Sequence, residues 1–365
     1  MLNGWSSSII CSRRLCYALG ALLCFLTCGG EATIKLPDGT VIPAIIAFGD
    51  SIIDQGMNNY IPAIAKCNFP PYGDDLPGGN PTGRFSNGKT AIDIIAEELG
   101  VKELVPPYLD PNLQIEDLKT GVSFASAGSG YDPLTTQNGG GISLSQQLDY
   151  FREYLKKLRN VLGENETNFI TENSLLWVLS GSNDIAITYF TLGLRRLQYT
   201  IDAYTDFMVE SASSFIQELY GIGTRRIGVF SQVPIGCVPA MRTLNGGNSW
   251  NCAEKQNEVA KLVNAKLSDE IDFLSKTLPG VKLVFIDLYH PLLDLIQNPG
   301  KYDFEESERG CCGTGKLEAS YLCNKFSPTC KEHDKFIFWD SFHPTEACNK
   351  ILVEQILPKY ISHLT

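Results

Sequence analysis

The 365-residue sequence predicts an α/β domain with three layers, in which helices cover both faces of a five-stranded parallel sheet. Five short apolar runs alternate along the chain with amphipathic stretches of about a dozen residues or more, which is typical of doubly wound sheets. The first run, residues 45–48, is apolar throughout, as expected of a strand buried on both faces. The expected strands are residues 45–48, 122–127, 175–179, 226–230 and 281–287.

Between the strands, apolar residues at helical spacing predict the helices. These are residues 89–99, 143–162, 204–220 and 252–278, followed by a last helix that begins at Pro344 and runs to Leu357. Gly100 and Gly163 mark the ends of the first two helices. In contrast, residues 55–88 are rich in Gly, Asn and Pro and predict a long loop, which in a compact domain is usually functional.

Residues 1–30 predict a secretory signal peptide. Two arginines precede an apolar run over residues 15–28, which is shorter than the roughly 20 residues that a membrane-spanning helix needs. An uncleaved membrane anchor is the alternative. We expect a single mature domain over residues 31–365, secreted to the extracellular space (apoplast or cell wall), without a stable membrane span. Asn165 lies in a usable Asn-Glu-Thr sequon and is expected to be glycosylated.

The mature chain would be acidic. Two of the 30 basic residues leave with the signal peptide, so 28 remain against 41 acidic residues, a net charge of −13. This charge argues against nucleic acid as a partner. The sequence leaves the oligomeric state open.

The cysteines predict disulfides, because eight of the twelve follow residue 30 and an even number on a secreted chain favours bridges. Zinc binding is the alternative, but the spacings match no common zinc pattern. We expect Cys237 and Cys252 to be joined across a Gly- and Asn-rich loop, which would contribute about 3 kcal/mol in the chain-entropy model. Most of the remaining bridges would come from Cys311, Cys312, Cys323 and Cys330.

Ser51 is the candidate nucleophile. It follows the first apolar run directly after Gly49 and Asp50, where glycine permits a sharp exit from the strand. Open α/β sheets bind ligands at the carboxyl ends of their strands, so Ser51 would lie at the ligand-binding edge. Taken alone, Gly-Asp-Ser is more typical of an ordinary turn, and the assignment depends on distant partners.

His343 is the candidate base and Asp340 the acid that orients it. A serine hydroxyl becomes a nucleophile when an imidazole takes its proton, and the imidazole needs its second nitrogen held by an acceptor. Among the four histidines, His343 is singled out by the Asp-x-x-His sequence just before the last helix. A metal-ligand pair or a helix cap would have the same spacing.

Donors for an oxyanion are expected at three strand ends. These are the backbone N–H of Ser51, the N–H at the Gly128 turn and the side-chain amide of Asn183. Parallel pairing would bring all three to one edge of the sheet, where each well-aimed donor is worth on the order of 3 kcal/mol. Turn chemistry alone would also account for Gly128 and Asn183.

Seven short motifs follow one another over nearly the whole mature chain. They are FGDSIID (48–54), GRFSNGK (83–89), FASAG (124–128), GSND (181–184), PIGCVP (234–239), GCCGTG (310–315) and DSFHPT (340–345). No single motif is decisive, but in their ordered set the chain resembles the plant GDSL esterase/lipase family, a branch of the SGNH hydrolases. Departures from the family pattern are minor: Ile52 where leucine is usual, Met57, and Ser123 where asparagine is frequent.

The resemblance implies a flavodoxin-like α/β/α fold and the hydrolysis of carboxylic esters, sometimes with acyl transfer. It implies Ser51 as nucleophile, His343 as base and Asp340 as orienting acid. It also implies an oxyanion hole from Ser51, Asn183 and a glycine. That glycine is Gly128 or, because the turn admits more than one register, Gly130.

We therefore expect a secreted serine ester hydrolase that works through an acyl-enzyme on Ser51, without a metal or an organic cofactor. Its substrate would be a small-molecule or polymeric ester, such as a lipid, cuticle or acetylated carbohydrate ester. An acyltransferase with the same site is one alternative. A non-catalytic secreted binding protein on the same scaffold is the other.

Overall fold

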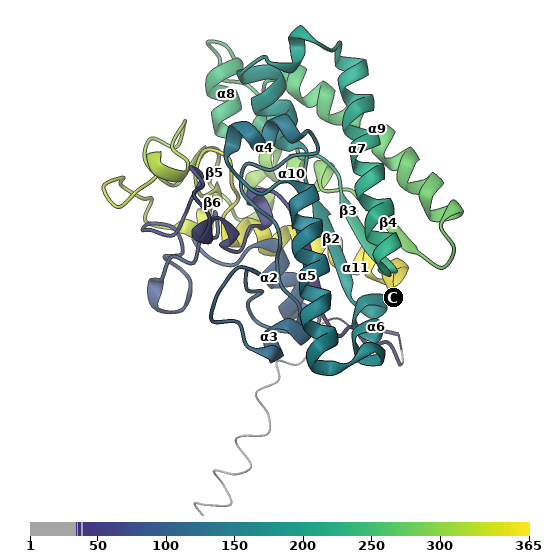
Figure 1. Cartoon of the computed structure of the whole chain (residues 1–365). Helices are drawn as coiled ribbons and strands as arrows, with labels where there is room; N and C mark the ends of the chain where they lie inside the picture. Colours follow the sequence, from purple (N-terminus) through teal and green to yellow (C-terminus); the bar gives the residue numbers. More distant parts are fainter. Residues whose placement is uncertain (1–33, 35, 38) are drawn as a thin grey trace, which may run out of the picture.

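The structure, a computed structural model, describes residues 34, 36–37 and 39–365 (Figure 1). The predicted signal peptide, residues 1–30, lies outside the described residues. Four parallel strands form the central sheet in the order β1-β2-β3-β4. Their bounds are β1 (Ile45–Gly49), β2 (Leu175–Leu179), β3 (Arg226–Phe230) and β4 (Lys282–Ile286).

Residues 122–126 occupy the position of a fifth strand on the free side of β1. Phe124 N–H donates to the Ala47 carbonyl at 2.8 Å and Ser126 N–H to the Gly49 carbonyl at 2.9 Å. The segment forms only isolated bridges, which join Ser123 to Ala47 on one side and to Pro107 on the other. The prediction of a regular strand over residues 122–127 is therefore wrong, although the segment lies where that strand was expected.

With this segment included, the five extended segments follow the spatial order 2-1-3-4-5, counted along the chain. This is the flavodoxin-like order, in which the connections reverse direction beside the first strand. The predicted three-layer α/β fold is confirmed. The order also determines where a ligand site lies, since such sheets bind ligands at the reversal point, beyond the carboxyl ends of the strands.

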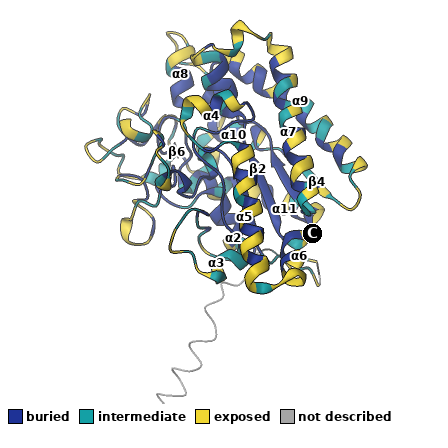
Figure 2. Ribbon diagram, viewed as in Figure 1, coloured by how far each residue is buried: buried dark blue, intermediate teal, exposed yellow. Residues whose placement is uncertain are grey.

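Helices cover both faces of the sheet. Figure 1 shows α5 and α7 in front of the sheet and α11 behind it. The outward sides of these helices are exposed and their inward sides buried (Figure 2). The front layer comprises α5 (Leu144–Leu162), α7 (Ile201–Ile222) and α9 (Glu254–Thr277), and the rear layer α2 (Ala91–Glu98), α10 (Tyr289–Gln297) and α11 (Glu346–Leu364).

Phe48 of β1 packs at the centre of the front interface. Its ring lies 5.2 Å from that of Phe124, 5.4 Å from Phe151 of α5 and 5.6 Å from Phe215 of α7, measured between centroids. Edge-to-face and offset aromatic pairs of this kind add about 1 kcal/mol each beyond the area they bury. The cluster holds β1, and with it the start of the loop that carries Ser51, against the front helices.

Several short elements that few apolar residues mark were not predicted. These are α3 (Ile115–Thr120), α4 (Pro133–Gly139), α6 (Glu164–Asn173), α8 (Pro239–Asn245) and β5 (Glu306–Gly310). Strand β5 pairs with β6 (Phe336–Phe338), an apolar run, in a separate parallel sheet beside the central one.

The predicted bounds of the last helix are wrong at both ends. Helix α11 begins at Glu346, where the Thr345 hydroxyl caps it by accepting from the backbone N–H of Cys348. It continues through Pro358 to Leu364. Proline removes one backbone hydrogen bond, but the last turns still bury apolar side chains, including Ile361, against the core.

Three disulfides join cysteines of the part of the chain that the structure describes, and the predicted Cys237–Cys252 bond is among them. The other two, Cys311–Cys330 and Cys312–Cys323, close two overlapping loops between β5 and β6. Among residues 39–365, the buried cysteines at positions 67 and 348 form no disulfide. The doubly bridged loop over residues 311–330, called the disulfide loop below, borders the site described next.

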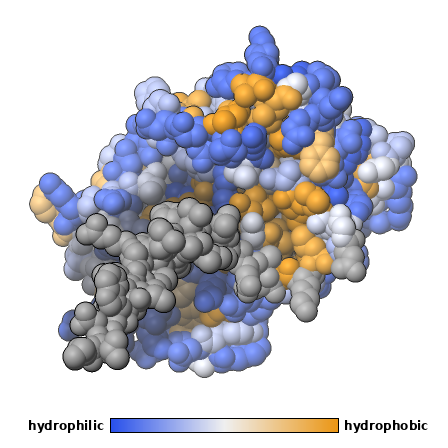
Figure 3. Space-filling model, turned by 90° about the horizontal axis from the view of Figure 1, so that it is seen from below, coloured by the Kyte–Doolittle hydropathy of each residue, from blue (hydrophilic) through white to orange (hydrophobic). Residues whose placement is uncertain are grey.

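Within the described residues, no helix combines the length and apolar character needed to cross a bilayer. The face seen from below is largely hydrophilic, with apolar side chains gathered in separate patches (Figure 3).

Candidate active site

Ser51 lies just beyond the carboxyl end of β1, and Gly49 determines how the chain leaves the strand. Gly49 has φ +144°, and a Cβ there would lie 1.8 Å from the carbonyl oxygen of Leu179 on β2, so only glycine fits. Asp50 then caps a short turn by accepting from the Ile52 N–H at 3.1 Å. These local constraints direct the Ser51 hydroxyl into a cavity at the sheet edge.

The structure brings together Ser51, His343 and Asp340, although Ser51 and His343 are 292 residues apart in sequence. Ser51 Oγ lies 2.8 Å from His343 Nε2, and His343 Nδ1 lies 2.8 Å from both carboxylate oxygens of Asp340. Asp340 also accepts from the N–H groups of Phe342 and His343, each at 2.8 Å. The turn after β6 thus holds the carboxylate and the imidazole in one rigid unit.

Gly128 and Asn183 line the same cavity as Ser51 and His343. The Asn183 side chain donates to the Ser129 carbonyl at 2.9 Å, which orients the amide and leaves its second hydrogen for another acceptor. Gly130 does not line this cavity, and a Cβ there would lie 2.2 Å from Asp184 Oδ1. Of the two glycine registers, the geometry therefore favours Gly128.

Two buried polar residues that support the site were missed in the sequence. Gln147 of α5 accepts from the Gly49 N–H and donates to the Gly49 carbonyl, both at 2.9 Å. Asp54 accepts from the N–H groups of Gly56 and Met57 at 2.7 Å and of Ala127 at 2.9 Å. For Gln147 a sequence signal existed, because a glutamine within the apolar stripe of a predicted helix indicates a buried polar side chain that needs hydrogen-bond partners.

Burial changes the ionisation of the carboxyl groups around the nucleophile. It raises the pKa of Asp50 to about 7, although the Ile52 N–H and His343 oppose the shift. It raises the pKa of Asp54 to about 6, against three backbone hydrogen bonds, and that of Asp184 to about 7. The Asp50 Oδ2 atom has no hydrogen-bond partner among the described residues.

Asp287 and His290 repeat the Asp-x-x-His spacing and were not singled out in the sequence. Their side chains pair at 2.8 Å through His290 Nδ1, as in the Asp340–His343 pair. The His290 side chain is 74% exposed, however, and it does not line the Ser51 cavity. The spacing alone therefore produces the pairing, and the tertiary structure decides which pair meets a serine.

The predicted glycosylation site and a histidine near two cysteines lie apart from Ser51. Asn165 is exposed in the first turn of α6. His333 lies close to Cys311 and Cys330, a grouping that resembles a metal site. The two sulfur atoms are bonded to each other, so they are not thiolate ligands.

A flavodoxin-like sheet with a serine, a histidine and an aspartate in hydrogen-bond contact at its carboxyl edge is an arrangement found in ester hydrolases. The sequence comparisons agree with this class. The GDSL-like lipase/acylhydrolase family model matches residues 45–356, so the chain belongs to that family.

Its relatives in Arabidopsis thaliana include two closely similar proteins. GDSL esterase/lipase EXL3 is 50% identical over 359 residues, which cover 98% of this chain and 96% of the relative. GDSL esterase/lipase At5g42170 is 53% identical over 336 residues, covering 92% and 90%. The chain is accordingly a carboxylic ester hydrolase.

We predict that Asp50→Asn reduces the pH dependence of stability. The pKa of the wild-type Asp50 carboxyl rises from 3.8 to about 7 on folding, so the folded state holds the proton more tightly. The resulting stabilisation is complete below pH 3.8 and is lost as the pH rises through about 7. Between pH 5 and pH 8 this loss amounts to about 2 to 3 kcal/mol.

Urea unfolding at pH 5 and at pH 8 measures how far the free energy of unfolding differs between the two pH values. Asp50→Asn should decrease this difference by about 2 to 3 kcal/mol. Asparagine keeps the acceptor for the Ile52 N–H. Asp269→Asn, at an exposed carboxylate, is the control and should leave the difference unchanged. Equal pH dependence in wild type and Asp50→Asn would contradict the prediction.

Proposed function

We propose that this protein is a secreted serine esterase in which Ser51 is the nucleophile, His343 the base and Asp340 the acid that orients it. The observation that carries the proposal is the continuous hydrogen-bonded chain from Ser51 Oγ through the imidazole to the carboxylate. Such a chain activates a hydroxyl that is otherwise a weak nucleophile. Each group that the reaction needs is supplied by the protein, so the proposed mechanism uses no metal or organic cofactor.

In the first half-reaction Ser51 Oγ attacks the ester carbonyl carbon while its proton moves to His343 Nε2. The negative charge that develops on the carbonyl oxygen is stabilised by the N–H groups of Ser51 and Gly128 and by the Asn183 amide. The tetrahedral intermediate then expels the alcohol, which takes the proton from His343. Throughout these steps Asp340 accepts from His343 Nδ1 and stabilises the imidazolium.

In the second half-reaction water attacks the acyl-enzyme. His343 Nε2 takes a proton from the water and returns it to Ser51 Oγ as the acyl–serine bond breaks. The products are the carboxylic acid and the free enzyme. If an alcohol takes the place of water, the same steps give a new ester, which is the acyltransferase alternative. Product analysis with a competing alcohol separates the two outcomes.

The cavity supports an ester with an apolar acyl group. Its volume is about 390 Å³, and its mouth is open to solvent. Most of the side chains around the reacting groups are apolar, as in sites that bind hydrocarbon groups. They include Ile64, Ile187, Ile235, Tyr321 and Leu322. We therefore propose lipid or cuticle esters as the substrates, in preference to acetylated carbohydrates.

Extracellular location, in the apoplast or cell wall, is part of the proposal. The three disulfides support it, because such bonds persist in oxidising compartments. The exposed Asn165 would carry a glycan on a secreted chain. Mass spectrometry of the protein purified from culture medium, before and after enzymatic deglycosylation, tests the glycan and the cleavage of residues 1–30.

We predict that Ser51→Ala and His343→Ala each decrease kcat by at least about 10³-fold and that the double mutant is no worse. The nucleophile and the base act as one unit, so removing either removes the same step. His290→Ala is the matched control, because it deletes an imidazole held by the same Asp-x-x-His pairing away from the cavity.

The measurement is the steady-state hydrolysis of a series of esters, together with labelling by a fluorophosphonate. Wild type and His290→Ala should be labelled, and Ser51→Ala should not. Unchanged turnover of Ser51→Ala on every ester would overturn the assignment. Failure of the wild type to be labelled or to hydrolyse any ester would favour the binding-protein alternative.

Asn183→Ala should decrease kcat by about 10² to 10³-fold with little change in KM, because its amide donates to the oxyanion only in the transition state. Asn138→Ala is the matched control. Asn138 also lines the cavity, but its amide donates to the Leu134 carbonyl. Equal kcat values for the two variants would show that Asn183 has no part in the oxyanion hole.

Activity should be lost at acid pH, because a protonated His343 cannot accept the proton of Ser51. The same profile should be obtained in the presence of EDTA. Measuring kcat/KM from pH 4 to pH 9 with and without the chelator checks both points. Loss of activity on chelation that zinc or manganese restores would instead indicate a metal site built on Asp50, Asp340 and His343.

A further inference from the structure

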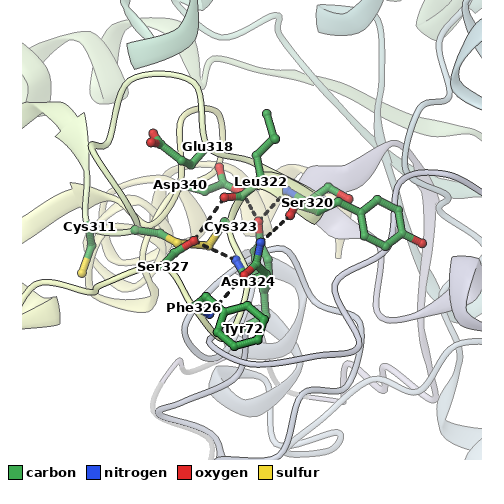
Figure 4. The surroundings of a disulfide bond; sticks show 12 residues. Tyr72, Cys311, Glu318, Ser320, Leu322, Cys323, Asn324, Phe326, Ser327 and Asp340 are labelled. Atoms are coloured by element: carbon green, nitrogen blue, oxygen red, sulfur yellow. Dashed lines mark hydrogen bonds between the residues drawn. A yellow bond between two sulfur atoms is a disulfide. The ribbon is translucent and has the colours of Figure 1, made fainter.

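Tyr72 connects the proposed catalytic acid with the disulfide loop. The side chain is fully buried within the long loop over residues 55–88. Its hydroxyl donates to Asp340 Oδ2 at 2.7 Å and accepts from the backbone N–H of Ser320 at 2.8 Å. Figure 4 shows Tyr72, Ser320 and Asp340 gathered around the Cys312–Cys323 disulfide.

The hydroxyl completes the contacts of the carboxylate. Asp340 Oδ1 accepts from the N–H groups of Phe342 and His343 and also lies 2.8 Å from His343 Nδ1. Among the described residues, the hydrogen-bond partners of Oδ2 are His343 Nδ1 and the Tyr72 hydroxyl. Without this hydroxyl, the backbone would hold the carboxylate through Oδ1 alone, and Oδ2 would keep only the imidazole, so the orientation of the ring that faces Ser51 would be less firmly fixed.

Ser320 forms the other end of the connection. It begins the short turn Ser320–Leu322 with φ +50°, and its side chain accepts from the Lys66 N–H and donates to the Lys66 carbonyl. The next two residues, Tyr321 and Leu322, line the cavity and are 52% and 64% exposed. Cys323 then bonds to Cys312. This cavity wall is therefore held by a disulfide at one end and by Ser320 at the other.

We propose that Tyr72 is a positioning residue that holds two parts of the site in register: the Asp340 carboxylate that orients His343, and the wall that contacts the acyl group. The inference rests on the proposed function. It adds that one buried hydroxyl supports both the orientation of the catalytic histidine and the position of the wall that contacts the acyl group. The aromatic packing does not require that hydroxyl, because it is the Tyr72 ring that forms T-shaped contacts with the rings of Phe69 and Phe85.

The test is Tyr72→Phe, with Tyr154→Phe as the matched control. Tyr154 is also fully buried, and its hydroxyl donates to the Leu118 carbonyl at 2.6 Å, outside the cavity. Both variants lose one buried hydroxyl and keep the ring. The readouts are kcat and KM for nitrophenyl acetate and nitrophenyl octanoate, the pH profile of kcat/KM, and the melting temperature.

Tyr72→Phe should decrease kcat about 10-fold for both esters, the scale of one hydrogen bond to a charged group. It should raise KM for the octanoate several-fold and leave that for the acetate nearly unchanged, because only the longer chain reaches the wall. The rise of kcat/KM with pH on the acid side of the profile, called the acid limb below, should move to higher pH. An Asp340 carboxylate with one donor fewer attracts the imidazole proton more strongly.

Other titratable groups face this pair, and they are the same in both variants. Asp50 lies on the nucleophile loop, the segment that leaves β1 and carries Ser51, and burial raises the pKa of Asp50 to about 7. Cys67 lies near both Asp340 and the Tyr72 hydroxyl, and burial raises the pKa of its thiol well above the ordinary value, so it stays uncharged in both variants. A displacement of the acid limb in Tyr72→Phe, absent in Tyr154→Phe, therefore reports on the Tyr72–Asp340 bond.

A second variant examines the wall separately. Ser320→Gly suits the positive φ and removes the side-chain bonds to Lys66, but it keeps the N–H that donates to Tyr72. It should raise KM for the octanoate and leave the acid limb in place. An unchanged ratio of the two KM values in this variant would overturn the role of the turn, even if Tyr72→Phe failed to fold.

Wild-type kcat, KM and pH profile in Tyr72→Phe, with only a lower melting temperature like that of Tyr154→Phe, would overturn the proposal. Ser51→Ala is measured in parallel. If Ser51→Ala is inactive while Tyr72→Phe behaves as wild type, the coupling is wrong and the proposed function stands. If Ser51→Ala remains active, the proposed function itself has failed.

Discussion

The geometry of the site depends on the close contact between β1 and β2 at Gly49. The parallel pairing of these strands brings the Gly49 backbone so near Leu179 that a side chain could not fit between them. Strand order reverses beside β1, so the loops that leave its two neighbours diverge and a cavity opens between them. Ser51, Gly128 and Asn183 follow these three neighbouring segments and reach that cavity from different directions.

Buried polar side chains hold this arrangement rather than apolar packing alone. Gln147 binds both backbone groups of Gly49, and Asp54 joins the nucleophile loop to the segment before Gly128. A buried polar group costs free energy unless it is hydrogen-bonded, so each such residue tolerates few arrangements of its neighbours. The raised pKa of Asp50 reflects the same desolvation where compensation is incomplete.

Different structural features hold the two halves of the site: one half follows the strands of the central sheet, and the other lies on loops. Strands β1 and β2 and the front helices position Ser51 and Asn183 through a large apolar core. His343, Asp340 and the cavity wall lie instead on irregular chain with a small core of its own, which includes two disulfides and buried aromatic rings. Covalent bridges replace extended secondary structure there, since short loops bury too little apolar surface to hold one conformation.

From the sequence alone followed the fold class, four strands to within a residue or two, the long helices, the Cys237–Cys252 bond and the set of candidate site residues. These rest on local signals: apolar periodicity, glycine at turns and short motifs. Only the tertiary structure decided that residues 122–126 stay irregular and that Tyr72 and Gln147 support the site. Each of these depends on hydrogen bonds between segments far apart in the chain, and local spacing does not specify which distant partner a buried polar group will find.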